Sequence, residues 1–154
     1  MDCTFITTEG KFNLRAAAVI KDGNRVLVGV DNTGGYYYTM GGRVKFGETA
    51  EAAILREIRE ETGVCAEIDR LYSINEKFFR LNGTQYHEVE FLFLIKPFDV
   101  SQIDYSAIRC DGADARLVWL DTTVPPDMPV FPGNLFEAVN CPTAEVRFTV
   151  ENSL

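Results

Sequence analysis

The 154-residue chain has very few histidines and cysteines, and this scarcity narrows its chemistry. Its only histidine, His87, argues against a histidine-rich zinc site and against catalysis by several histidines. No Gly-x-Ser-x-Gly sequence is present to hold a nucleophilic serine. His87 lies in an alternating stretch, residues 86–90, and is expected to be a strand residue. Attack by metal-activated water is the chemistry that these absences leave open.

The cysteines Cys3, Cys65, Cys110 and Cys141 are widely separated and form no Cys-x-x-Cys pair. We therefore expect free thiols in a reducing cytoplasm rather than disulfides or a zinc site. The first residues show no apolar run after a basic start, and no stretch reaches 18 uninterrupted apolar residues. Neither a signal peptide nor a membrane span is expected.

Basic residues are also outnumbered, with 15 Lys and Arg against 23 Asp and Glu, and the formal net charge is −8. Binding of DNA or RNA polymers depends on clustered Lys and Arg, so such a partner is not expected. A small nucleotide that arrives with its own divalent cation is compatible with an acidic site. With 46% hydrophobic residues, the chain suits one domain, residues 1–154, with a core of its own.

The most informative stretch covers residues 41–64, where Glu57, Glu60 and Glu61 stand at helical spacing. On a helix their side chains fall within about 100° of arc. Like charges one turn apart repel by roughly 0.2–0.5 kcal/mol per pair, and the helix dipole disfavours anions near the C-terminal end. A hard cation such as Mg²⁺ or Mn²⁺ would turn this repulsion into binding. The alternative is a solvated acidic face, partly neutralised by Arg56 and Arg59.

Local signals position this helix. Thr49 is expected to cap its N-terminus and Gly63 to end it. Ala50 and Ala53 lie on the side of the glutamates and are too small to block a ligand. The preceding loop contains three glycines, which permit close backbone approach: Gly41, Gly42 and Gly47.

This segment resembles the Nudix box, the signature of hydrolases that act on nucleoside diphosphates linked to another moiety. The box reads Gly, five residues, Glu, seven residues, then Arg-Glu-aliphatic-x-Glu-Glu-x-Gly-aliphatic. The chain supplies every position: Gly42, Glu48, Arg56, Glu57, Ile58, Glu60, Glu61, Gly63 and Val64. Just before the paired glycines, many members have proline where this chain has Met40.

The resemblance implies roles for these residues. Glu57, Glu60 and Glu61 would hold the Mg²⁺ or Mn²⁺ ions, and the carbonyl of Gly41 would add a ligand. Glu57 or Glu60 would also take the proton of the attacking water, and Arg56 would orient the glutamates through ion pairs. Glu48 would reach from the loop toward Arg56 or a metal-bound water.

The family is variable in its general base, and a second pair of acids offers an alternative. Glu88 and Glu90 alternate on an expected strand, so they share one face. That face either looks toward the metal site or is an outward, solvated surface. Glu76 is a weaker candidate for the base.

Residues that contact substrate are harder to identify. Arg15 and Arg43 are candidates for phosphate contacts, and Gly42 permits close approach of the backbone. Tyr38, with Tyr36 and Tyr37, is a candidate for stacking on a base, as are Phe78 and Phe79; the alternative is a core role. Features of ADP-ribose and NADH hydrolases are missing, so a nucleoside triphosphate or another small nucleotide derivative is the default.

The rest of the chain indicates an α+β domain. A hairpin is expected from Leu14–Lys21 and Arg25–Val30, and a second one from Ala66–Phe79 and Tyr86–Lys96 through the turn Asn82-Gly83. Further strands are expected at Tyr36–Met40, Arg116–Leu120 and Glu145–Val150, and a short helix at Asn134–Val139. The resemblance implies the Nudix α/β/α sandwich with a mixed central sheet.

Two functions remain open at this stage. The first is Mg²⁺-dependent hydrolysis of a pyrophosphate bond, and the second is a non-catalytic module that senses nucleotides with the same fold. The complete box favours the hydrolase, because a sensor has no need of every acid that activates water. Many members of the family are dimers, and a homodimer is a further expectation.

Overall fold

The computed structural model describes residues 1–31, 34–105 and 115–154. Cys110 lies outside these residues, whereas Cys3, Cys65 and Cys141 are free thiols, as predicted. The elements follow in the order β1 (Thr4–Ile6), β2 (Lys11–Val19), β3 (Lys21–Asp22), β4 (Arg25–Asp31), β5 (Tyr36–Arg43), α1 (Ala50–Thr62), β6 (Ile68–Leu81), β7 (Thr84–Ile95), η1 (Val100–Gln102), β8 (Ala115–Asp121), β9 (Val130–Phe131), α2 (Leu135–Asn140) and β10 (Arg147–Asn152).

The strands form a mixed sheet whose main path runs β10-β6-β7-β2-β5-β4-β3. Strand β2 pairs in parallel with β7 and antiparallel with β5, and β10 pairs in parallel with β6. The predicted hairpin between Leu14–Lys21 and Arg25–Val30 is wrong in its pairing. Both edges of β2 are taken by β5 and β7, so only Lys21–Asp22 is left to pair with β4.

The hairpin of β6 and β7 agrees with the sequence prediction. Its turn residues Asn82 and Gly83 have φ of 51° and 78°, the left-handed values that an Asn-Gly turn requires. The predicted strands at Tyr36–Met40, Arg116–Leu120 and Glu145–Val150 correspond to β5, β8 and β10. The predicted short helix is α2.

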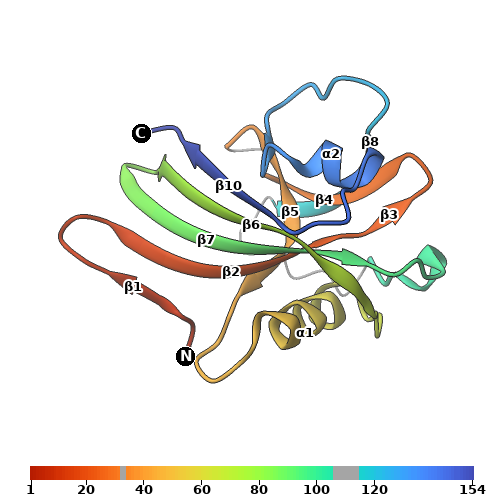
Figure 1. Ribbon diagram of the computed structural model, residues 1–154, viewed down its shortest axis with the longest axis horizontal. Helices are drawn as coiled ribbons and strands as arrows, with labels where there is room; N and C mark the ends of the chain where they lie inside the picture. The colour runs from red at the N-terminus through yellow and green to blue at the C-terminus, as the bar shows by residue number, and fades with distance from the viewer. Residues whose placement is uncertain (32–33, 106–114) are drawn as a thin grey trace.

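Helices cover the sheet from two sides, as Figure 1 shows with α1 below the strands and α2 above them. Alternate residues of β2 face opposite layers. Ala16 and Ala18 join the apolar cluster that includes α1, whereas Ala17 and Val19 join the cluster that includes α2. The predicted α/β/α sandwich is therefore confirmed.

The limits of α1 also match the prediction. The Thr49 hydroxyl accepts a hydrogen bond from the Ala52 N–H at 3.1 Å, and Gly63 ends the helix with φ of 75°. The Gly63 N–H donates to the Arg59 carbonyl, so the helix end is satisfied. None of the helices in the described ranges is long and apolar enough to cross a membrane.

Gly63→Ala is expected to lower the free energy of unfolding by about 1–2 kcal/mol, because a Cβ is strained in the left-handed conformation. An added Cβ would meet only Asp104 at 3.7 Å, an ordinary contact, so the cost lies in the backbone. Urea unfolding followed by circular dichroism measures the loss. Gly63→Asn is the control, since asparagine tolerates this conformation; equal losses in the two variants would contradict this explanation.

Candidate active site

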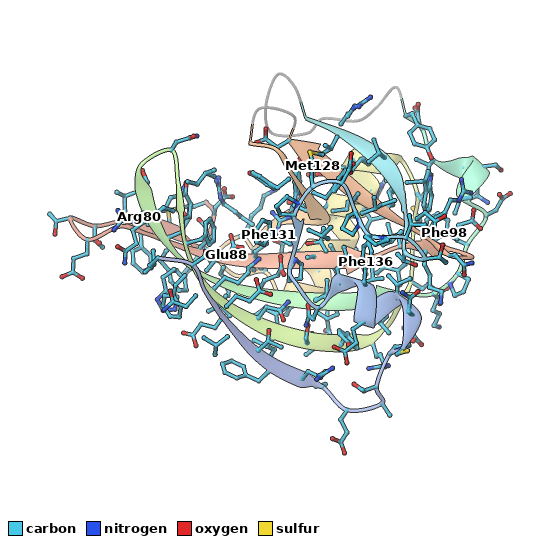
Figure 2. All side chains as sticks on the ribbon, turned by 90° about the horizontal axis from the view of Figure 1, so that it is seen from above. Arg80, Glu88, Phe98, Met128, Phe131 and Phe136 are labelled. Carbon is cyan, nitrogen blue, oxygen red and sulfur yellow. The ribbon has the colours of Figure 1, made fainter. Side chains whose placement is uncertain are left out.

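A cavity of about 1070 Å³ opens between β2, β5, β6, β7 and the C-terminal half of α1. All of the predicted site residues line it: Arg15, Tyr38, Gly41, Gly42, Arg43, Arg56, Glu57, Glu60, Glu61, Glu88 and Glu90. In Figure 2, Glu88 and Phe131 lie near the centre of the view and Arg80 lies toward the β6–β7 hairpin; all three line the cavity. The fold thus joins segments that are far apart in the sequence.

Arg56 holds the carboxylates of the Nudix segment together. Its Nε and Nη2 donate to the two oxygens of Glu48 at 2.8 and 2.9 Å. Its Nη1 donates to Glu57 at 2.6 Å and to Glu60 at 3.3 Å. These hydrogen bonds, first those to Glu48, raise the pKa of Arg56, and in return they lower the pKa of Glu48 to about 2. Arg56 is placed as an orienting residue should be.

Gly41 and Gly42 are adjacent, but a side chain is excluded at each position for a different structural reason. A Cβ at Gly42 would lie 2.3 Å from Oε1 of Glu57, so the missing side chain makes room for that carboxylate. Gly41 has φ of 137°, and a Cβ there would lie 2.2 Å from the Ala16 carbonyl oxygen of the neighbouring strand. Gly42 therefore shapes the site, whereas Gly41 permits close packing of β5 on β2.

The donor set suits a hard divalent cation. Glu57, Glu60 and Glu61 all line the cavity, and Gly42 leaves open space beside the first of them. Within the described ranges, no three acidic, His or Cys side chains converge on one point. The ion pairs with Arg56 hold Glu57 and Glu60 instead, and a cation would compete with Arg56 for these oxygens.

Glu90 is the centre of a second group of charges, on the sheet. Its Oε2 accepts from Arg15 at 3.2 Å and lies 3.0 Å from Lys77 Nζ, and its Oε1 accepts from Asn75 at 3.2 Å. Burial would raise the pKa of Glu90, but the nearby Lys77 and Arg15 outweigh it and lower the pKa. Glu90 is only 1% exposed, so the solvated outer face considered for it does not exist.

Glu88 also faces the cavity and not solvent. Its Oε1 lies 2.8 Å from Lys77 Nζ, and its Oε2 accepts from Asn13 at 3.2 Å. Sequence reasoning missed Lys77. The signal was present in the alternation of Asn75 and Lys77 on the strand that pairs with Glu88 and Glu90.

The remaining candidates divide between the cavity and other surfaces. Arg15 is engaged by Glu90 and donates to the Thr39 carbonyl at 2.6 Å, whereas Arg43 has a longer ion pair with Asp2 at 3.6 Å. Phe78, Phe79 and Tyr36 line the cavity together with Tyr38.

Tyr37, Glu76 and His87 lie outside the cavity lining. The Tyr37 hydroxyl donates to Asp127 at 2.9 Å, outside the cavity lining. His87 is a residue of β7, as predicted, and pairs with Glu76 at 2.8 Å. Glu76 does not line the cavity.

Comparison with known proteins decides the family. The family model of the NUDIX domain matches residues 11–137. The chain belongs to the NUDIX domain family. Its box and its α/β/α sandwich are thus those of a Nudix domain.

Among individual relatives, the Putative nudix hydrolase 1 of Caenorhabditis elegans is 34% identical over 79 residues. That match covers 47% of this chain and 22% of the relative, so the chain spans about a fifth of that protein's length. The mutator MutT protein of Bacillus halodurans superposes with a TM-score of 0.67 at 18% identity, covering 90% of this chain and 89% of the other. An ADP-ribose pyrophosphatase of Streptococcus suis gives 0.53 at 14% identity, with 90% and 98% covered. These two likenesses show the MutT-like fold.

Gly41→Ala is expected to lower the free energy of unfolding by about 1–3 kcal/mol, because its Cβ would collide with the backbone at Ala16. Gly42→Ala is expected to change it by less than about 1 kcal/mol, since the end of a flexible side chain, Glu57, can move away. Urea unfolding of the two variants tests this contrast. A larger loss at position 42 than at position 41 would show that the assignment is reversed.

The Arg56–Glu48 pair makes a pH-dependent contribution to stability. Its carboxyl pKa falls from an ordinary 4.5 to about 2 in the fold, so the stabilisation is complete above pH 4.5 and disappears as the pH falls through about 2. Glu48→Gln is therefore expected to cost on the order of 1 kcal/mol at pH 7, after allowance for solvent screening, and almost nothing near pH 2. Urea unfolding across this range measures the difference. Glu9→Gln, at an exposed position, is the control; a constant deficit of Glu48→Gln at every pH would contradict the linkage.

Proposed function

We propose that the chain hydrolyses a pyrophosphate bond in a nucleoside di- or triphosphate derivative, with Mg²⁺ or Mn²⁺ as the metal. One observation carries this proposal: the three clustered glutamates of the Nudix box, Glu57, Glu60 and Glu61, line the same cavity. Arg56 binds the first two of them, and Gly42 leaves room for the Glu57 carboxylate. A site built for binding alone would not require so many carboxylates beside an anionic ligand. The substrate is a small molecule, and the expectation against nucleic-acid polymers rests on the negative net charge.

Glu57, Glu60 and Glu61 would hold the metal, with the carbonyl of Gly41 as a further ligand. When bound, such an ion neutralises phosphate charge and lowers the pKa of a bound water. Arg56 positions Glu57 and Glu60 through its Nη1 hydrogen bonds and is itself fixed by the two-oxygen contact with Glu48.

The proton of the attacking water requires an accessible carboxylate. Glu60 is 56% exposed at its side chain and has one long contact, 3.3 Å, with Arg56, so it is free to accept that proton. Glu57 is the other candidate in the box. Glu90 is poorly suited to the task, because its lowered pKa and its four donor side chains, Arg15, Thr39, Asn75 and Lys77, favour the charged form. Glu88 keeps acceptor capacity and remains the alternative on the sheet.

The cavity supplies contacts for both ends of a nucleotide. Tyr36 and Phe131 have ring centroids 5.9 Å apart and, with Tyr38, offer aromatic faces for a base. Arg43, whose ion pair with Asp2 is long, is the candidate for a phosphate contact, and Gly42 allows the backbone to approach.

The second candidate is a nucleotide sensor that binds without turnover. It would use the same cavity and cation, and it differs from the hydrolase in the absence of turnover. The complete set of box residues favours the hydrolase.

We expect purified protein to hydrolyse one class among triphosphates, oxidised dNTPs, ADP-ribose, nucleotide sugars, NADH and dinucleoside polyphosphates. EDTA should abolish turnover, and Mg²⁺ or Mn²⁺ should restore it. Glu60→Gln and Glu61→Gln should each lower kcat/KM by roughly a hundredfold or more, as expected when a catalytic carboxylate is lost. Chromatographic detection of the products measures the rates.

Glu51→Gln is the matched control, because Glu51 lies in the first turn of α1 and outside the cavity. It should leave kcat/KM unchanged. If no class is hydrolysed while nucleotides still bind in a cation-dependent way, the sensor replaces the hydrolase.

A further inference from the structure

Two rows of polar side chains cross the sheet on the cavity side. In register from β2 through β7 to β6, the outer row is Asn13, Glu88 and Lys77, and the inner row is Arg15, Glu90 and Asn75. Their four charged members, Arg15, Lys77, Glu88 and Glu90, are called the sheet cluster below. All four line the cavity.

The stability of the fold does not require the buried charges of the sheet cluster. Burying charges costs free energy that their attraction does not reliably return, and apolar residues of similar size often give equal or greater stability. Lys77 and Glu88 are each 8% exposed, and Glu90 is 1% exposed. Further along the same face, the sheet continues with the apolar core residues Ala17 and Leu92. Apolar residues are therefore compatible with this face of the sheet. Such departures from ordinary packing are expected where a ligand binds.

The members of the sheet cluster differ in how much hydrogen-bonding capacity they keep. Glu90 has the most partners, since Arg15, Thr39 and Lys77 contact its Oε2 and Asn75 contacts its Oε1. Lys77 has three N–H groups and directs two of them to Glu88 and Glu90. Glu88 accepts once at each oxygen, which leaves further lone pairs. A ligand on the cavity floor therefore meets a donor, Lys77, beside an acceptor, Glu88.

We propose that Lys77 and Glu88 read the base of the substrate and select a 6-oxopurine. The two reading atoms lie side by side, with Lys77 Nζ 2.8 Å from Glu88 Oε1. Such a pair complements a base edge on which a carbonyl oxygen stands next to an N–H group. In guanine, O6 would accept from Lys77, and N1–H and the exocyclic amine would donate to Glu88. Glu90 is a positioning residue that holds the Lys77 ammonium, and Arg15 in turn holds Glu90.

Other bases fit this pair less well. Adenine offers a ring nitrogen in place of the carbonyl oxygen and a single amine for the carboxylate. Uracil would bring its second carbonyl oxygen against Glu88, where two acceptors repel. The stacked rings of Phe79 and Tyr86, 5.0 Å apart at 10°, lie in the next row of the same face and border the floor.

This inference rests on the proposed hydrolysis, because it names the base of that substrate, yet binding tests it without chemistry. The probes are GMP, IMP, AMP and UMP, added in EDTA and followed by titration calorimetry. We expect GMP to bind at least about tenfold more tightly than AMP or UMP, the discrimination expected of one well-placed pair of contacts. IMP, which keeps the carbonyl and N1–H but lacks the amine, should lie between GMP and AMP.

Glu88→Gln keeps the shape of the side chain and should bring the GMP-to-AMP affinity ratio close to one. Lys77→Met should do the same, provided that its thermal unfolding stays cooperative. Glu67→Gln, at an exposed position paired with Lys96, is the control and should keep the full ratio. If the sheet cluster had only a structural role, these substitutions would weaken the binding of all four nucleotides alike. The GMP-to-AMP affinity ratio would then stay unchanged.

The outcomes separate the two proposals. Absence of a GMP preference in the folded wild-type protein, absence of any binding, or a preference retained in Glu88→Gln would each overturn the base readout. A GMP preference in a protein that hydrolyses no nucleotide would overturn only the proposed hydrolysis. Hydrolysis with equal kcat/KM for guanosine and adenosine substrates would overturn only the base readout.

Discussion

The arrangement of the cavity depends on the contact of one guanidinium with three carboxylates. Arg56 touches Glu48, Glu57 and Glu60, and without it these acids would repel one another across a short distance. The planar guanidinium can do this because its donors point in several fixed directions at once. A lysine at this position would offer one point of charge and could not keep the same geometry.

Opposite charges also compensate one another in the sheet cluster. Arg15 and Lys77 together neutralise Glu88 and Glu90, and the pKa directions of Arg15, Lys77 and Glu90 all favour the charged forms. Here the cations come from β2 and β6 and the anions from β7, so the cluster exists only when three strands are in register. The carboxylate partners of Arg56, in contrast, come from one short segment, residues 48–60.

This difference explains which parts of the site could be predicted. The box glutamates follow from helical spacing, and Thr49 and Gly63 set the ends of the helix through local backbone effects. The Asn82-Gly83 turn was predictable for the same reason, because its φ values depend on those two residues. Lys77 was missed, since a lysine on a strand is usually solvated and only the pairing of β6 with β7 buries it. The prediction of a hairpin between β2 and β4 was also wrong. Strand β5, from later in the chain, pairs with the edge of β2 that β4 would have used.

The sequence by itself determined the family, the helix with its acidic face, the alternation of strands, and the chemistry that carboxylates without histidines can support. These features depend on residues close together in the chain, where spacing and backbone preference are enough. The tertiary structure decided that Glu88 and Glu90 face inward, that Arg15 is committed to Glu90, and that Lys77 joins them. Those outcomes depend on strand register and burial, which bring together residues as far apart as Arg15 and Glu90 and which no local pattern encodes.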